Sequence, residues 1–193
     1  IDHMYGQSVY LKTNSQRFRN ENDFTTNIPK GKIRVICSGD SFTLGYGVDN
    51  AHTWCNLLEL IYPRIQSVNM GQGGYGIGQS YLWYKRDGVK LDHNIHIFAF
   101  ITADFTRMMK KSFLGMPKPL LRVKNGRIVV ENIPISTLSS HKILKYLKFF
   151  NFFRLTNEIR KVNFSDNIDK PSIFRKGEGE KLVGMIFDSL QKI

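Results

Sequence analysis

Ser41 lies just beyond a short apolar run in this 193-residue chain. Residues 33–48 read IRVICSGDSFTLGYGV, and the apolar run stops at Gly39-Asp40-Ser41. A serine at the carboxyl end of a buried strand lies where an open α/β sheet presents reactive groups to a ligand. Gly39 permits a tight bend there, and Asp40 and Ser41 are residue types that start helices. The tripeptide therefore predicts either a nucleophilic serine or a plain helix cap, and its context decides between them.

Two further segments supply that context. Residues 68–79 read VNMGQGGYGIGQ, a glycine-rich turn that begins in a predicted short strand, residues 66–70. The apolar run IHIFAFI, residues 95–101, ends at Thr102-Ala103-Asp104. Apolar runs of this kind, separated by helical patterns, predict buried parallel strands whose carboxyl ends meet at one edge of a sheet. The serine, the glycine-rich turn and the carboxylate are therefore expected to lie close together.

Together these blocks resemble those of the SGNH hydrolases, also known as GDSL-type hydrolases. GDSFTLGYGV matches the block that carries the family's serine nucleophile, VNMGQGGYGIGQ is similar to its second block, and the order and spacing agree over roughly residues 10–110. The resemblance implies that Ser41 is the nucleophile and that the backbone N–H groups of Ser41 and Gly74 form the oxyanion hole. It implies supporting roles for Asp40 and Asp104, and a three-layer α/β/α, flavodoxin-like fold of parallel strands.

The segment before the first strand extends the resemblance to a class of substrate. KTNSQRFRNE, residues 12–21, is similar to a Pro-Asn-x-x-Gly-x-Arg run in SGNH members associated with surface glycans. The resemblance therefore implies a serine esterase, O-acyl hydrolase or acyltransferase that acts on ester-linked acyl groups of carbohydrates. It implies no cofactor.

Two departures from the family pattern bear on activity. The family's third block has an asparagine that donates to the oxyanion, and Ala103 stands there instead; losing such a donor can cost about 10²–10³ in turnover. The family's Asp-x-x-His, which supplies the base, does not follow Asp104: His141 is the one later histidine, and Leu138 precedes it by three positions. A serine hydroxyl is a poor nucleophile without a base, so we expect this chain to be inactive.

Three functions fit these residues. The first is an SGNH-like esterase or acyltransferase truncated in this chain, which ends on a helical pattern where a doubly wound sheet would continue into another strand. The second is a non-catalytic SGNH-like binding protein in surface polysaccharide assembly. The third is a flavodoxin-like module that binds a phosphorylated ligand at the glycines of residues 71–78, although no P-loop Lys-Ser/Thr follows them.

Histidines elsewhere in the chain suggest other chemistry. Asp49 and His52 match Asp-x-x-His, but we interpret Asp49 as a helix cap with His52 in the first turn. The cluster Asp92-His93-Asn94-Ile95-His96 has residue types that bind metals. It directly precedes an apolar strand and lacks a fuller ligand pattern, so we interpret His96 as structural and predict no metal site.

The predicted elements form one domain, residues 32–193, after an entry arm, residues 1–31. Asn125-Gly126 predicts a β-hairpin within an insertion of about residues 106–161. The insertion continues into an aromatic and basic helix, interpreted as a packing helix or as one that lies on a membrane surface. The expected elements are parallel strands at 32–38, 66–70 and 95–101, helices at 51–62, 76–87, 138–161 and the C-terminus, hairpin strands at 120–123 and 127–130, and a loop at 163–175.

Charge and composition limit the partners. The net charge is +12; residues 1–105 carry 10 Lys and Arg against 9 Asp and Glu, whereas residues 106–193 carry 18 against 7. This basic half favours anionic polysaccharide or a membrane surface without specific recognition of nucleic acid, although a solvated basic face has the same composition. Cys37 and Cys55 are expected to be core thiols. No apolar run is long enough to span a membrane, which leaves both the cell envelope and the cytoplasm open as locations.

Overall fold

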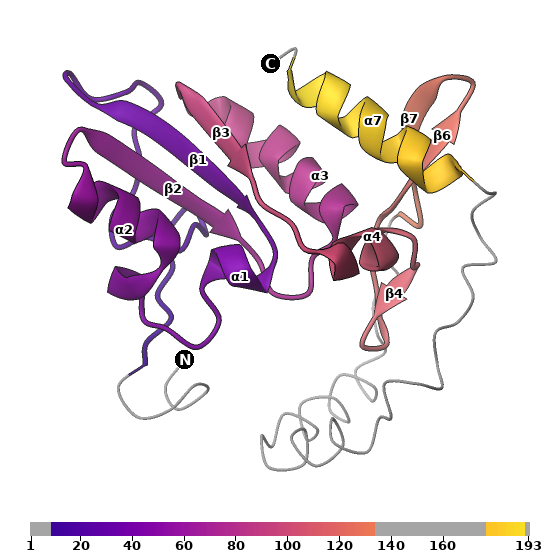
Figure 1. Cartoon of the computed structure of the whole chain (residues 1–193), viewed down its shortest axis with the longest axis horizontal. Coiled ribbons are helices and arrows are strands. Elements are labelled where there is room, and N and C mark those ends of the chain that lie inside the picture. Colours follow the sequence, from indigo (N-terminus) through magenta and orange to yellow (C-terminus); the bar gives the residue numbers. More distant parts are fainter. Residues whose placement is uncertain (1–8, 134–176, 192–193) are drawn as a thin grey trace.

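A three-stranded parallel sheet forms the centre of the fold. The computed structural model describes residues 9–133 and 177–191. β1 (Ile33–Gly39) lies between β2 (Ile65–Gly71) and β3 (Ile95–Phe98) and pairs in parallel with both (Figure 1). The three predicted strands are confirmed, but β3 ends at Phe98 rather than at residue 101. β1 stops at Gly39, so no residue of β1 remains to pair with residues 100–101.

Helices pack against both faces of this sheet. Val35 and Cys37 of β1 lie in an apolar cluster with α2 (Trp54–Ile61), whereas Ile36 lies in a cluster with α3 (Ile77–Asp87). Alternate residues of a strand point to opposite faces, so β1 is buried on both. The chain therefore has a mixed α/β fold. The other helices in the described part of the chain are α1 (Ser41–Leu44), η1 (Asn50–His52), η2 (Gly88–Lys90), α4 (Thr102–Met108) and α7 (Glu178–Leu190).

The two helices predicted between the strands are present, and the first of them is divided. α3 starts one residue after the predicted position and ends where predicted. The helix predicted at 51–62 is split into η1 and α2 at Thr53, whose hydroxyl accepts a hydrogen bond from the backbone N–H of Asn56 at 3.3 Å. Threonine is a preferred N-cap, so α2 begins at Trp54.

Both cysteines lie in the core. Cys37 of β1 and Cys55 of α2 are buried free thiols in one apolar cluster. Burial raises the pKa of Cys55 well above its ordinary value, and the neighbouring Cys37 raises it further. The prediction of core thiols is confirmed.

Two hairpins follow α4. β6 (Leu120–Lys124) and β7 (Arg127–Glu131) pair antiparallel around Asn125-Gly126, whose φ angles are 50° and 71°. This confirms the predicted Asn-Gly hairpin, because that turn needs two positive φ angles. A second hairpin, β4 (Ser112–Phe113) with β5 (Met116–Pro117), was not predicted. Its strands are only two residues long, too short to show an alternating pattern.

The predicted C-terminal helix is α7, which packs against α3, β6 and the ring of Phe98. Figure 1 shows it on the same side of the sheet as α3. Within residues 9–133 and 177–191, no helix is long and apolar enough to cross a bilayer. The helix predicted at 138–161 and the loop predicted at 163–175 lie outside the described residues.

The described part of the entry arm packs onto the sheet. Phe18 is 2% exposed and joins the core cluster around Trp83. The side chain of Asn20 donates to the carbonyl of Ser67 at 3.0 Å and accepts from the N–H of Asn69 at 2.9 Å. Asn20 thereby satisfies backbone groups at the outer edge of β2, which exposed edge strands otherwise leave unpaired.

Two buried arginines fasten the arm to the domain. Arg19 is 2% exposed and donates to three main-chain carbonyls within residues 44–48, at the end of α1 and in the turn after it. Arg34 of β1 is fully buried and donates to carbonyls of the arm at residues 26 and 27, at 2.8 and 3.0 Å. Each guanidinium satisfies carbonyls that would otherwise be buried without a donor.

One arm residue has a backbone conformation that favours glycine. Arg17 has a φ of 71°, and it occupies the position of the glycine in the Pro-Asn-x-x-Gly-x-Arg run. The left-handed conformation costs an L-residue about 1–2 kcal/mol. Arg17 therefore stores local backbone strain in this chain.

Candidate functional site

Ser41 is the first residue of α1, directly after the central strand of the sheet. Asp40 is the N-cap: its Oδ1 accepts a hydrogen bond from the N–H of Phe42 at 2.9 Å. α1 is one turn long and ends at Gly45, which has a φ of 86°. Ser41 is half-buried, whereas Phe42 beside it is 67% exposed. The serine therefore lies at the carboxyl end of β1, as predicted, and partly faces solvent.

Two glycines allow α1 to pack tightly on the strand ends. A Cβ at Gly39 would overlap the side chain of Thr43 and the carbonyl of Ala99. A Cβ at Gly71, the last residue of β2, would overlap the backbone of Thr43 and Leu44. Only glycine fits such close backbone approaches. These glycines thus hold the serine turn against the ends of β1 and β2.

Gly74 lies in the turn between β2 and α3 and has a φ of 75°. The ring of Phe113 in β4 packs against it, so that a Cβ at Gly74 would lie 2.5 Å from a ring carbon. Figure 1 shows α1, α4 and β4 together at the carboxyl ends of the strands. The unpredicted hairpin therefore covers the turn that holds the predicted oxyanion donor.

Arg107 of α4 connects the elements of this site. Its Nη1 lies 2.7 Å from Oδ1 of Asp104 and 3.2 Å from Oδ2 of Asp40. The same nitrogen donates to the carbonyl of Tyr75 at 3.5 Å, and the guanidinium lies 5.4 Å from the ring centre of Phe113. Arg107 thus contacts the residue before Ser41 and the residue after Gly74.

The charges in this network are largely excluded from water. The side chains of Asp40 and Asp104 are each 2% exposed and that of Arg107 is 20% exposed. Burial raises the pKa of Asp104; the charge of Asp40 raises it further, while the N–H of Ile101 and the guanidinium of Arg107 act against the rise. Two buried carboxylates share one cation, so the loss of Arg107 would leave both without a counter-charge.

The structure brings some predicted residues into this network and leaves others outside it. Asp40 and Asp104 both contact Nη1 of Arg107. Ala103 is exposed on α4 and offers no side-chain donor. Ser41 and Gly74 each lie next to a residue that Arg107 contacts, and their turns both belong to the carboxyl edge of the sheet.

The described histidines bond to partners other than Ser41. Asp49 caps η1: its Oδ1 accepts a hydrogen bond from the backbone N–H of His52 at 3.1 Å, which agrees with the predicted cap. The same oxygen lies 2.7 Å from Nδ1 of His52. His96 stacks on Tyr84 with ring centres 3.8 Å apart, and its Nε2 lies 2.6 Å from Oγ of Ser38. Burial, with a smaller contribution from the nearby His93, lowers the pKa of His96 to about 4. His96 is therefore a packed structural histidine.

Among the described residues, no group of three or more His, Cys, Asp or Glu side chains is arranged to hold a metal ion. Two buried or partly buried titratable residues were missed by the sequence analysis, one in the site and one outside it. Arg107 stands three positions after Asp104, a spacing that pairs side chains on one helix face, and this signal could have identified it. Lys118 follows β5 and is 4% exposed, and burial lowers its pKa to about 8. No local pattern indicates that a lysine in a turn is buried.

Comparisons with known proteins do not assign the site. No family model, curated protein or solved structure matches this chain. The resemblance to SGNH hydrolases therefore rests on short sequence blocks alone.

Proposed function

We propose that this chain is an SGNH-like serine esterase, O-acyl hydrolase or acyltransferase domain that acts on ester-linked acyl groups of carbohydrates. The observation that carries the proposal is the position of Ser41. It starts α1 at the carboxyl end of the central parallel strand, where doubly wound folds bind their ligands. In this proposal the sheet and its helices form the three-layer, flavodoxin-like core of that family.

The proposed chemistry is nucleophilic attack by the Ser41 hydroxyl on an ester carbonyl. The backbone N–H groups of Ser41 and Gly74 would stabilise the resulting oxyanion, because fixed donors need no reorganisation as charge develops. Two features support this role. Glycines hold the serine turn close to the ends of β1 and β2, and Arg107 contacts Asp40 and the carbonyl of Tyr75 beside the two donors.

The chain by itself is expected to be inactive. Attack by Ser41 requires a group that accepts the hydroxyl proton, and no Asp-x-x-His follows Asp104 in the sequence. Ala103 also removes the side-chain donor that the family pattern provides there.

The alternative is a non-catalytic SGNH-like binding protein in surface polysaccharide assembly. The observation that favours it is the ring of Phe113, which packs directly on Gly74. A bulky ring at this turn limits the space for a tetrahedral intermediate beside the Gly74 N–H. In this alternative the same edge of the sheet would bind an acylated glycan without cleaving it.

The test supplies the missing base from solution. The wild-type chain and Ser41→Ala are incubated with p-nitrophenyl acetate, with and without imidazole, and mass spectrometry of the digested protein reports acetylation of residue 41. The esterase proposal expects imidazole-dependent acetylation of Ser41 well above that of the other serines, because imidazole can accept the hydroxyl proton at this site. Ser41→Ala measures the background acetylation of other residues, including that by acetylimidazole formed in solution.

Two outcomes would change the assignment. Absence of acetyl-Ser41 at any imidazole concentration, together with binding of an acetylated oligosaccharide, would favour the binding protein. Ser41-dependent turnover without imidazole would show that the chain contains its own base. His52, which pairs with Asp49, and the buried Lys118 would then be tested as His52→Gln and Lys118→Met.

A further inference from the structure

A cavity of about 470 Å³ lies between the entry arm and the end of α3, and Ser41 is not among its lining residues. One wall comes from residues 15–18 of the arm and the other from residues 86–91 of α3 and η2. Phe18 and Leu91, both nearly inaccessible, belong to these two walls. The volume falls in the range of sites for small organic ligands and exceeds what a bare inorganic anion needs.

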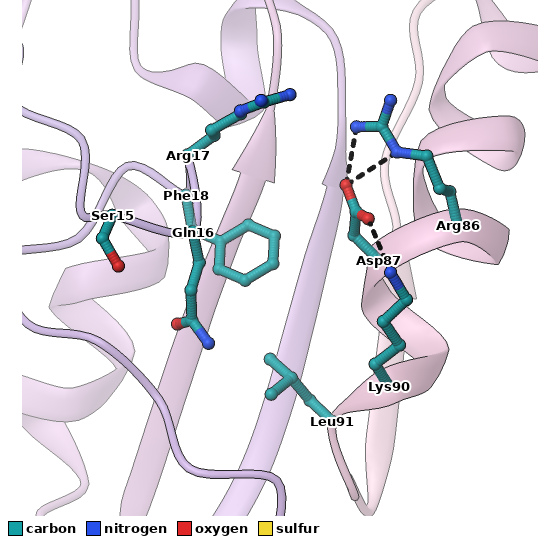
Figure 2. A pocket seen from close by; sticks show the side chains of 8 residues that line it. All are labelled: Ser15, Gln16, Arg17, Phe18, Arg86, Asp87, Lys90 and Leu91. Atoms are coloured by element: carbon teal, nitrogen blue, oxygen red, sulfur yellow. Dashed lines mark hydrogen bonds and ion pairs between the residues drawn. The ribbon is translucent and has the colours of Figure 1, made fainter.

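The lining of this cavity is cationic. It includes Arg17, Arg86 and Lys90 against the single carboxylate of Asp87. Figure 2 shows Arg17 on the arm wall and Arg86, Asp87 and Lys90 on the other. These residues all belong to the first half of the chain, whose positive and negative charges nearly balance. The excess of positive charge is therefore a property of the cavity and not of that half as a whole.

The cations of the α3 wall are held in place. Asp87 accepts from Nε1 of Trp83 at 3.0 Å and from Nε and Nη2 of Arg86 at 2.9 and 2.6 Å, and Nζ of Lys90 lies 3.4 Å from its other oxygen. The hydrogen bond to Asp87 raises the pKa of Arg86. A fixed guanidinium loses less side-chain freedom when it binds an anion.

Arg17 on the opposite wall is unusual in two respects. Its φ of 71° is a conformation that glycine adopts without strain, and none of the described residues forms a hydrogen bond or ion pair with its guanidinium. Backbone strain in a residue that lines a cavity is a recognised feature of functional sites. A glycine at position 17 would relieve the strain but would remove the cation.

We propose that this cavity binds an anionic sugar, with Arg17 and Arg86 recognising its carboxylate or phosphate group. Guanidinium groups match the geometry of both anions. The volume accommodates a sugar ring, and the Ser15 hydroxyl and the Lys90 ammonium supply further polar contacts to its hydroxyl groups. The site is separate from Ser41, and the proposal does not depend on the proposed esterase function.

The experiment measures binding to the whole chain by NMR titration or calorimetry. The probes are glucuronic acid, glucose 6-phosphate, uncharged glucose and inorganic phosphate. We expect one or both sugar anions to bind at least about tenfold more tightly than glucose and inorganic phosphate, a difference of about 1.4 kcal/mol. The first two probes distinguish a carboxylate from a phosphate as the anion.

The central variant is Arg17→Gly, which is expected to retain or raise the stability of the fold while it weakens binding about tenfold. Arg86→Gln is expected to weaken binding similarly, and Lys85→Gln, an exposed neighbour outside the cavity, is the matched control. Equal affinity for glucose, equal affinity for inorganic phosphate, or unchanged binding in both arginine variants would overturn the proposal. Loss of binding in Arg17→Gly with a stable fold would support the proposal. Replacing a purely structural residue would not lower the affinity for the sugar anion while leaving the stability of the fold unchanged.

Discussion

Arg107 shows how one side chain can hold a site together. All three of its polar contacts converge on Nη1, which reaches Asp40, Asp104 and the carbonyl of Tyr75. Removing one partner of a buried ion pair leaves uncompensated charge and costs about 3–5 kcal/mol. Arg107→Met is therefore expected to lower the free energy of unfolding by about that amount in urea denaturation.

Arg107→Lys should recover part of this loss, because it keeps a positive charge beside the two carboxylates, but the shorter ammonium does not reproduce the position of Nη1 or the contact with Phe113. Arg86→Met is the control; the side chain of Arg86 is 60% exposed where it pairs with Asp87, so its removal should cost less than about 1 kcal/mol. A loss in Arg107→Met no greater than that in Arg86→Met would show that the network does not stabilise the site.

His96 makes stability depend on pH. Its pKa is lowered to about 4 in the fold by burial, against about 6.5 in an unfolded chain. Between these values the unfolded chain binds the proton and the folded chain does not, so stability falls as the pH drops from about 6.5 to about 4. The loss of stability across this window is on the order of 3 kcal/mol, since each pKa unit corresponds to about 1.36 kcal/mol.

The measurement is urea denaturation of the wild-type chain and His96→Gln at several pH values across this window. Glutamine can still bond to Ser38 but does not titrate, so the variant should lose stability less steeply as the pH falls. Carboxylates titrate in both proteins, and the difference between the two slopes isolates the histidine. Parallel slopes would contradict the assignment of His96 as a buried neutral residue.

At the scale of elements, the entry arm behaves as part of the domain core. Arg19 donates to three carbonyls at the end of α1 and in the turn after it, so Arg19→Met would leave buried acceptors without donors. We expect a loss of about 2–4 kcal/mol in the free energy of unfolding, because each unsatisfied buried group costs about 1–3 kcal/mol.

Lys12→Met provides the matched control on the same arm. Lys12 pairs with Glu21 at 2.6 Å, but their side chains are 60% and 55% exposed. Exposed pairs contribute about 0–1 kcal/mol. Similar small losses in both variants would mean that the arm is only loosely attached to the sheet.

At the scale of the whole molecule, the basic second half is the feature that bears on partners. We expect this half to bind acidic polysaccharide or anionic vesicles. Such binding should weaken when the salt concentration rises from about 50 mM to about 500 mM, because the screening length shortens. The variant Lys142→Glu/Lys145→Glu/Lys148→Glu, at positions outside the described residues, should weaken it at low salt as well. Sedimentation with the polymer or the vesicles measures both effects.

The control reverses three exposed charges in the nearly neutral half, with Lys30→Glu, Arg64→Glu and Lys85→Glu. It changes the net charge by the same amount as the first variant. Equal weakening in both triple variants would indicate a general effect of net charge, and unchanged binding in the first would assign its lysines to a solvated face.

The sequence by itself determined the features that depend on local patterns. Short strand patterns predicted β1, β2 and β3, with a nearly continuous apolar run in β3. Asn125-Gly126 predicted the hairpin, and Gly39-Asp40-Ser41 predicted a serine turn at the end of a strand. Each of these follows from side chains and turn residues within a few positions of one another. The predicted end of β3, at residue 101, was wrong. The end of a strand depends on how far its partner strand continues, and β1 stops at Gly39.

Only the tertiary structure decided which charges meet and which backbone is strained. Asp40 and Arg107 lie 67 positions apart, and nothing near either residue indicates their contact. The left-handed Arg17 and the carbonyls bound by Arg19 likewise depend on how the arm docks on the sheet. Burial in the assembled fold makes an unpaired polar group costly, and which distant residue can pair with it depends on how the segments pack, so no local pattern in the sequence specifies the contact.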